Sequence, residues 1–256
     1  MIDETQKTTQ ERKFKCWAAS CGGCGDGPSR EHLLSNCLFP DGVVRVKGFD
    51  WCMDETKTVG INGLARQILC KKHNSALSDT DAEAKKAIDL FQRSVQPLGG
   101  SSIGNKVDGH RLERWLLKTA INLAYGGKWH IGIGMHGSAP GLPPPYLIDV
   151  AFGKLPFSHK MGAHFLLPKK ETFHDPGAIL TFPLVKDGYI GGVYFELRTQ
   201  PIFLNLFPGN APPTLGEVAE SLSLQNHLLD TELIYRPPNI STTLRSLAAS
   251  MIYFDW

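Results

Sequence analysis

Apolar residues recur with a helical period in two stretches of this chain. Between residues 78 and 93 they fall three or four positions apart, which predicts an amphipathic helix. Ser78 stands three residues before an acidic side chain, a variant of the capping box that marks a helix start. A second helical pattern starts near residue 110, and Gly126-Gly127 is the stop signal that ends it.

Short apolar runs replace the helical pattern between residues 129 and 207. Turn-forming proline, glycine and aspartate separate these runs, which indicates strands. The predicted strands cover residues 129–135, 146–152, 163–168, 178–185, 191–198 and 201–207. Because no helical pattern lies between the strands, they favour an antiparallel sheet over a parallel doubly wound one. Shorter helices are expected around residues 215–222 and 241–253.

Composition divides the chain into two predicted domains. Residues 1–14 are polar and are expected to form a flexible arm, and residues 15–95 form the first domain. The stretch QPLGGSSIGNKVDG, residues 96–109, is rich in Pro, Gly and Ser, which is typical of a linker. Residues 110–256 form the second domain, with a mostly antiparallel sheet. The predicted fold class is therefore α+β.

The overall composition indicates a folded protein without a membrane segment. Hydrophobic residues make up 42% of the 256 residues, enough for a sizeable core. No apolar run approaches the roughly 18 residues of a membrane span. The polar start MIDETQKTTQERKFK lacks the apolar centre of a secretory signal. Six cysteines are too few for a disulfide framework, so we expect a cytoplasmic protein whose cysteines bind metal.

Net charge does not by itself indicate a nucleic-acid-binding protein, because it is only +2. Residues 56–78, however, contain no acidic side chain, and basic side chains there could face phosphate groups. The candidate nucleic-acid contacts are Arg30, Arg66, Lys71 and Lys72. The alternative is that these side chains belong to a solvated loop, or that Arg30 pairs with an acidic residue of a helix.

Two short motifs have the spacing of a zinc knuckle. Cys21 and Cys24 form a C-x2-C pair, and Cys70 and His73 form a C-x2-H pair. Zinc takes four thiolate or imidazole ligands in a tetrahedron, which two such pairs supply. Cys16, five residues before Cys21, is an alternative ligand. Because all four positions are taken by protein, this zinc is predicted to be structural; the alternative is a set of unligated, reduced cysteines.

A second group of polar residues lies next to these motifs. Glu31 and His32 follow the first pair, and Asn74 follows His73 directly. A carboxylate and an amide oxygen suit a magnesium or manganese ion, so Glu31 and Asn74 are the predicted ligands of a catalytic divalent cation. His32 could take a proton from an attacking water. The alternatives are a hydrogen-bonded polar histidine at 32 and a turn or capping residue at 74.

The order of these residues resembles the HNH endonucleases. The resemblance covers residues 16–95, and it implies the ββα-metal fold with a zinc knuckle. By this resemblance Glu31 and Asn74 bind the catalytic cation, and His32 is the general base. The chain departs from the family where the middle asparagine is expected, since Ala65 stands there; Asn62 or Arg66 could replace it. A long insert between His32 and Cys70 is predicted to form an extra hairpin.

We therefore predict a metal-dependent endonuclease that hydrolyses DNA phosphodiester bonds. The second domain is expected to target or regulate it, and a compact nuclease with a sensor fits bacterial anti-phage defence. One alternative is a zinc-knuckle module that binds nucleic acid without cleaving it. Another is a zinc protein that docks on a protein partner. RNA is an alternative substrate because both polymers share the phosphodiester group.

Overall fold

The computed structural model describes residues 15–47, 51–52, 55–93, 105–126, 130–132, 142–168, 179–186, 189–198, 200–206, 231–242 and 250–256. The predicted arm, most of the predicted linker and the predicted helix around 215–222 lie outside the described residues. Within this described part of the chain, no helix is both long enough and apolar enough to cross a bilayer.

The two helices predicted from the apolar period are both present. Helix α2 spans Ser78–Arg93 and helix α3 spans Gly109–Gly126. The first turn of α2 carries acidic residues, which the helix dipole favours. Helix α2 buries one apolar face, whereas α3 is buried on nearly all sides between residues 112 and 124. The buried apolar residues are Ala84, Ala87, Ile88 and Phe91 in α2, and Leu112, Trp115, Leu116, Leu117, Ala120, Ile121, Leu123 and Ala124 in α3.

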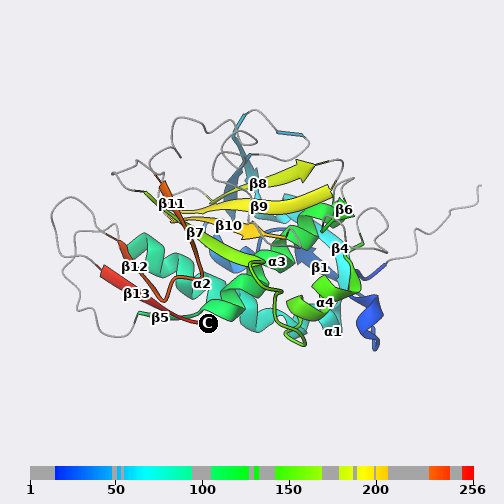
Figure 1. Ribbon diagram of the computed structural model, residues 1–256. Helices are drawn as coiled ribbons and strands as arrows, with labels where there is room; N and C mark the ends of the chain where they lie inside the picture. The colour runs from blue at the N-terminus through cyan, green and yellow to red at the C-terminus, as the bar shows by residue number, and fades with distance from the viewer. Residues whose placement is uncertain are drawn as a thin grey trace, which may run out of the picture.

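A six-stranded sheet forms the largest layer, as Figure 1 shows. Its strands are β6 (His130–Ile131), β7 (Gly162–Pro168), β8 (Ile179–Lys186), β9 (Tyr189–Leu197), β10 (Gln200–Asn205) and β11 (Thr231–Tyr235). The order is β11-β7-β10-β9-β6, and β8 also pairs with β9. All pairs are antiparallel except β6 with β9, so the predicted antiparallel sheet is confirmed with one parallel strand at its edge.

Two predicted elements in the second half have the wrong type. Residues 146–152 were expected to form a strand, but helix α4 spans Pro145–Ala151. Proline suits the first helical position, and the buried residues Leu147, Ile148, Val150 and Ala151 fall at helical spacing. The β-branched residues in this run favour a strand only weakly, and packing of the helical face outweighs that preference.

The helix expected at residues 241–253 is also wrong, because both described ends of this range are strands. Strand β12 spans Asn239–Thr242 and strand β13 spans Ser250–Asp255. In β13 the buried residues Ile252 and Phe254 alternate with exposed ones, which is the period of a strand. These two strands form a small sheet with β5 (Lys106–Asp108), in which β13 and β5 run parallel.

The first part of the chain contains two antiparallel strand pairs. Strand β1 (Pro28–His32) pairs with β4 (Ala65–Cys70), and helix α1 (Lys71–Ala76) follows directly. The predicted extra hairpin is present as β2 (Val43–Val46) and β3 (Lys57–Gly60). Three short 3-10 turns, η1 (Ala19–Cys21), η2 (Asn36–Leu38) and η3 (Ile61–Leu64), connect these elements.

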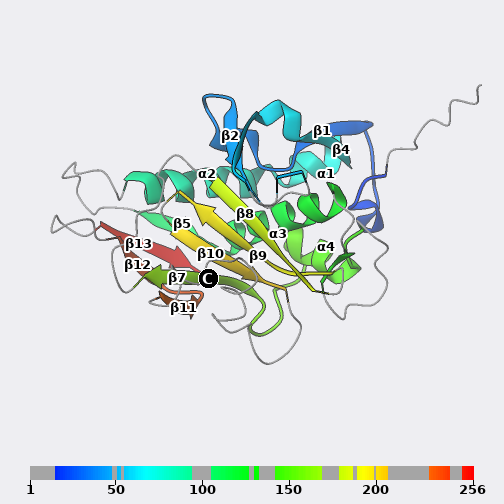
Figure 2. The same ribbon diagram turned by 90° about the horizontal axis from the view of Figure 1, so that it is seen from above.

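Helix α3 is the centre of the molecule. Figure 2 shows α2 and α3 between the part formed by β1, β4 and α1 and the six-stranded sheet. Buried side chains from residues 16–91 and 107–254 belong to one continuous hydrophobic cluster. The division into two domains remains a prediction, while the core described here is shared by residues from both sides of the predicted linker.

Candidate metal centre and the neighbouring strand

Three cysteines and one histidine converge near the start of α1. The ligand atoms of Cys16, Cys24, Cys70 and His73 all lie within 4.8 Å of one another. The Nδ1 atom of His73 is 3.4 Å from the sulfur of Cys16, 3.6 Å from that of Cys24 and 3.3 Å from that of Cys70. We call these four residues the Cys3His cluster. They come from two segments of the chain, residues 16–24 and 70–73, which the fold brings together.

The spacing inside the Cys3His cluster fits zinc. In a tetrahedral site with Zn–S near 2.3 Å and Zn–N near 2.0 Å, sulfur and nitrogen lie about 3.5 Å apart. The three observed distances, 3.3 to 3.6 Å, agree with that value. Three cysteines and one histidine are also a donor set that structural zinc sites use. The cluster is therefore a possible metal-binding site consistent with zinc, as the sequence predicted.

Local backbone contacts hold the cluster in place. Cys70 is the N-cap of α1, and its sulfur accepts a hydrogen bond from the backbone N–H of His73, 3.4 Å away. The backbone N–H of Trp17, next to Cys16, donates to the carbonyl of Ile68 in β4 at 3.0 Å. Strand β4 thus positions ligands from two separate segments.

A glycine turn carries Cys24 into the cluster. Gly22 and Gly23 have φ values of +74° and +65°, a backbone conformation that glycine adopts without strain. A Cβ atom at Gly23 would lie 2.7 Å from the Lys72 ammonium nitrogen. The positive φ angles therefore favour glycine in the turn after Cys21, and the Lys72 ammonium lies beside this turn.

The environment of the cluster shifts three pKa values. Burial lowers the pKa of the His73 imidazole, and the charges of Lys72 and Lys154 act in the same direction, against a hydrogen bond to the backbone of Gly22. Burial opposes ionisation of the Cys70 thiol, but hydrogen bonds from the His73 and Gly25 backbone outweigh it and lower its pKa. Neutral imidazole and thiolate are the forms that bind metal. Burial raises the pKa of the Cys16 thiol to about 12.

The structure changes one predicted zinc ligand. Cys21 was expected in the cluster, with Cys16 as the alternative, and the cluster contains Cys16. Cys21 ends the 3-10 turn η1, outside the cluster, and its thiol is one of the groups that raise the pKa of the Lys154 ammonium. The C-x2-C spacing alone cannot reveal this, because the turn geometry decides which sulfur faces His73. The buried Trp17 beside Cys16 is the sequence signal that this segment enters the core.

Glu31 faces the core and is bound by α3. Its side chain is 6% exposed, and its Oε1 atom is 2.7 Å from the Lys118 ammonium. The amide of Asn122 also donates to Oε1, at 3.3 Å. Lys118 in turn binds both carboxylate oxygens of Asp81 at 2.9 Å. Glu31 is thus part of a buried ion cluster, an arrangement that differs from the exposed carboxylate expected for a hydrated cation.

His32 is half-buried at the end of β1, and its ring contacts Asn62. The Nε2 atom of His32 lies 3.3 Å from Oδ1 of Asn62. An amide oxygen only accepts, so this contact favours the tautomer that carries its proton on Nε2. Neighbouring side chains of a strand point to opposite faces, which explains why Glu31 is buried while His32 is accessible. Asn62, one of the two residues considered as a substitute for the missing family asparagine, is therefore the one that contacts His32.

Asn74 contacts the other end of β1. Its side-chain nitrogen donates to the hydroxyl of Ser29 at 2.8 Å. This bond uses the donor end of the amide, so the carbonyl oxygen is the end that could bind a cation. Ser29 and His32 are three residues apart, about 10 Å along a strand that rises about 3.3 Å per residue.

The three predicted catalytic residues therefore have three different partners. Among the described residues, Glu31 binds Lys118, His32 contacts Asn62 and Asn74 donates to Ser29. No hydrogen bond joins any two of the three in the described coordinates. Glu31 and His32 lie on strand β1, with their side chains on opposite faces, and Asn74 is tied to the same strand through Ser29.

The four candidate nucleic-acid contacts are all exposed. They lie on β1, β4 and the first turn of α1, the elements that surround the Cys3His cluster, and they are Arg30, Arg66, Lys71 and Lys72. The Arg66 guanidinium donates to the carbonyls of Gly63 and Ala65, both at 2.8 Å, which holds it on the surface beside η3. A basic surface thus adjoins the strand that carries His32.

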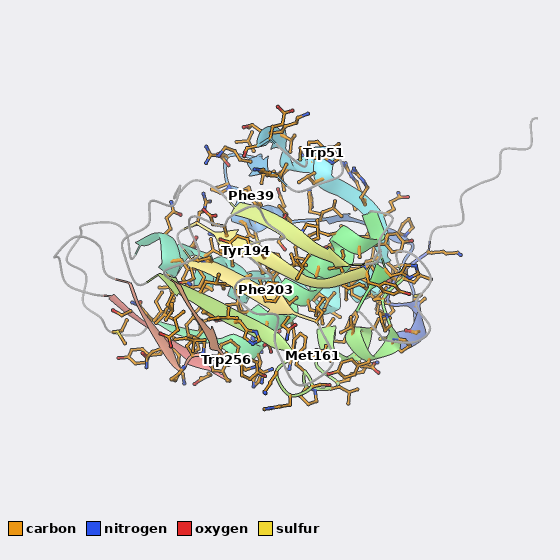
Figure 3. All side chains as sticks on the ribbon, turned by 45° about the horizontal axis from the view of Figure 1, so that its top comes forward. Phe39, Trp51, Met161, Tyr194, Phe203 and Trp256 are labelled. Carbon is orange, nitrogen blue, oxygen red and sulfur yellow. The ribbon has the colours of Figure 1, made fainter. Side chains whose placement is uncertain are left out.

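An exposed tryptophan lies on the segment between β2 and β3. Trp51 is 45% exposed, which is unusual for so large an apolar side chain. Figure 3 shows it on the outer side of the molecule, away from Tyr194 and Phe203 of the six-stranded sheet. An exposed indole can stack on a nucleic-acid base. The sequence pattern predicts the hairpin but gives no signal for a role of Trp51.

Comparisons with protein-family models, with curated proteins and with solved structures find no match. The resemblance to the HNH endonucleases therefore depends on the motif residues alone.

Two functional candidates in α3 were missed by the sequence analysis. Lys118 and Asn122 are both buried, at 1% exposure each, although their types are usually exposed. Their signal was available: both fall on the apolar stripe that contains Trp115, at three and seven residues from it. A lysine and an asparagine inside such a stripe indicate buried polar partners elsewhere in the fold.

Proposed function

We propose that this protein is a zinc-stabilised endonuclease of the HNH type, in which His32 acts as the general base on DNA. The observation that carries the proposal is the state of the His32 ring: it is half-buried, and Nε2 is held by Asn62 at 3.3 Å. With the proton on Nε2, the Nδ1 lone pair is the base that can accept a proton from water. A ring oriented by a second group is the arrangement that general bases use.

The arrangement around the Cys3His cluster supports the same proposal. Two antiparallel strands, β1 and β4, are followed directly by helix α1, with cluster ligands at the junction of β4 and α1. This order is what the HNH resemblance implies for a ββα unit. The cluster uses four protein donors, which suits a structural ion rather than a catalytic one.

The expected magnesium or manganese ion fits these residues only in part. The Asn74 carbonyl oxygen is a suitable donor, but Glu31 is buried and neutralised by Lys118. A cation at Glu31 would have to compete with an ammonium at 2.7 Å. We therefore assign no step to a bound divalent ion, and the chemistry assigned to this chain is proton removal by His32.

The surface beside His32 supports a nucleic-acid substrate. Arg30, Arg66, Lys71 and Lys72 are exposed on neighbouring elements, and basic side chains of this kind bind phosphate. In the proposed step a water that gives its proton to Nδ1 of His32 attacks the scissile phosphorus, the P–O bond to the leaving oxygen breaks, and that oxygen takes a proton from solvent. The half-buried ring leaves room for this approach. DNA is the proposed polymer, and RNA is the competing substrate in the experiment below.

The test is cleavage by the full-length protein. Wild type, His32→Ala and the matched control His159→Ala, an exposed histidine of the second half, are incubated with plasmid DNA and with labelled RNA in magnesium or manganese. We expect wild type and His159→Ala to cut DNA, and His32→Ala to lose about 100-fold or more in rate. Zinc content and DNA affinity should not change. Full activity of His32→Ala, or no cutting by wild type, would contradict the proposal.

A non-cleaving nucleic-acid-binding protein is the second candidate, and the burial of Glu31 favours it. This candidate predicts DNA affinity that falls steeply with salt, because each neutralised phosphate releases counterions. It predicts no strand breaks with either metal. A protein-docking zinc module predicts no salt-dependent DNA affinity. Cleavage therefore separates the endonuclease from the DNA-binding protein, and the salt dependence of DNA binding separates both from the docking module.

A further inference from the structure

We infer that Asn122 and Lys118 of helix α3 are positioning residues for His32, so that the second half of the chain completes the proposed active site. The inference rests on the proposed function, since it concerns the residue proposed as the base. It assigns to α3 a role beyond the targeting or regulation expected of the second half.

Asn122 connects the metal centre to His32. Its side-chain nitrogen donates to the backbone carbonyl of His32 and to Oε1 of Glu31, both at 3.3 Å. Its Oδ1 atom accepts from the indole N–H of Trp17 at 3.1 Å, and Trp17 is adjacent to the ligand Cys16. One buried side chain therefore binds the segment of a zinc ligand and the segment of the proposed base.

Lys118 extends the same contact to α2. Its ammonium lies between Glu31, at 2.7 Å, and the carboxylate of Asp81, at 2.9 Å. Asp81 also accepts from the hydroxyl of Ser35, which accepts from the Trp115 indole at 2.8 Å. Strand β1, helix α2 and helix α3 thus share one buried network of hydrogen bonds and ion pairs.

The donors of this network form one stripe on α3. Trp115, Lys118 and Asn122 are three and four residues apart, the spacing that aligns side chains along one helical face. Each directs a nitrogen toward the first part of the chain. We call these three residues the α3 polar stripe.

Residues of the α3 polar stripe contact strand β1 at two points, one just before and one just after the α-carbon of His32. The backbone carbonyl of His32 is held by Asn122, and the preceding side chain is held by Lys118 and Asn122. The ring then extends to the other face of β1, where Asn62 contacts Nε2. Buried polar groups are costly to leave without partners, so this arrangement persists only while α3 supplies its donors.

The experiment compares Asn122→Leu with Leu116→Ala in the full-length protein. Leu116 is on the same helix and fully buried, but outside the α3 polar stripe, so its truncation controls for a loss of packing. Hydrogen–deuterium exchange is measured on peptides that cover residues 28–34 and β9. Cleavage is measured in parallel as separate kcat and KM values.

We expect Asn122→Leu to raise exchange in residues 28–34 about tenfold, roughly the effect of losing one or two net hydrogen bonds, while β9 is unchanged. The kcat for DNA should fall about 10- to 100-fold with KM nearly constant, because misplacing the base affects the chemical step. Leu116→Ala should raise exchange in both regions alike and leave kcat per folded molecule unchanged. Zinc content should stay the same in both variants.

If exchange in residues 28–34 rises in Asn122→Leu but wild type does not cleave DNA, the proposed function is contradicted. The structural role of Asn122 is then still supported. Exchange in residues 28–34 that does not change in Asn122→Leu would overturn the inference, whatever the activity. If Asn122→Leu does not fold, Asn122→Ser, which keeps a small polar group, is measured in the same way.

Discussion

The Cys3His cluster and strand β1 lie next to each other but are organised in different ways. In the cluster, four ligand atoms meet within 4.8 Å. Along β1, the candidate residues Glu31 and His32 turn to different partners, Lys118 and Asn62. Strand β4 supports both, since it pairs with β1 and ends at the ligand Cys70. The ligands of the cluster come from residues 16–73, whereas the Glu31 side chain is held by a helix about ninety residues further along the chain. Adjacent sites in one fold can therefore depend on different parts of the sequence.

This difference determines which substitutions should act locally. A ligand of the cluster should affect metal binding and folding together, because the metal closes the segments on one another. A residue of the buried network should affect stability without metal loss. An exposed partner of His32 should affect neither.

The largest effect is expected from Cys16→Ser. Structural zinc contributes on the order of 10 kcal/mol to folding, so loss of a ligand should abolish zinc retention and lower Tm sharply. The matched control is Cys21→Ser, because Cys21 lies outside the cluster. Zinc per chain by mass spectrometry and Tm by calorimetry provide the measurements. Zinc loss in Cys21→Ser with retention in Cys16→Ser would reverse the assignment of the ligand.

An intermediate effect is expected from Lys118→Met. This change leaves the carboxylates of Glu31 and Asp81 without their cation, which should cost about 3–5 kcal/mol of unfolding free energy. Zinc should remain bound. The triple variant Glu31→Gln, Lys118→Met, Asp81→Asn removes all three charges and should recover much of the loss. Denaturant unfolding measures both variants, and an unchanged midpoint for Lys118→Met would show that the ion cluster does not stabilise the fold.

The same ion cluster predicts a dependence on pH. Burial opposes the charge on Lys118, but Glu31 and Asp81 outweigh it and raise the Lys118 pKa above its ordinary value. A raised pKa of a cation means that its contribution is fully present at neutral pH and is lost only as pH rises through the folded-state value. The stability difference between wild type and Lys118→Met should therefore persist at neutral pH and shrink only under strongly alkaline conditions.

The smallest effect on stability is expected from Asn62→Ala. Asn62 is exposed and contacts His32 at 3.3 Å, so its truncation should change the unfolding free energy by about 0.5 kcal/mol or less. Zinc should be unaffected. Cleavage should fall about tenfold, because the ring of His32 loses the contact that orients it. Unchanged cleavage together with unchanged stability would indicate that Asn62 has no role in the site.

Local sequence patterns predicted those parts of the molecule that depend on nearby residues. Helices α2 and α3 follow from their apolar period, and Cys70 and His73 are brought together by one helical turn. The choice between Cys16 and Cys21 could not be predicted, because it depends on how η1 and the glycine turn rotate the two sulfurs. The spacing of cysteine and histidine in the sequence predicted four ligands correctly, but not which cysteines supply them.

The setting of Glu31 could not be predicted for a different reason. Its position before His32 suggested a metal ligand, but its partners Lys118 and Asn122 are supplied by another part of the chain. Helix α4 shows the same limit, since buried neighbours rather than β-propensity decide its conformation. Sequence patterns describe what a residue can do, and distant packing decides which of those roles it takes.

The parallel pairing of β5 with β13 has a consequence for biosynthesis. Strand β5 leads directly into α3, and its partner spans Ser250–Asp255. The ring of Trp256 also lies against Gly109, the first residue of α3, so closely that a Cβ atom there would be 2.6 Å from it. A ribosome-bound chain that has not reached residue 250 therefore lacks the partner that closes the start of this helix. Activity that depends on α3 should emerge only after translation has passed that point.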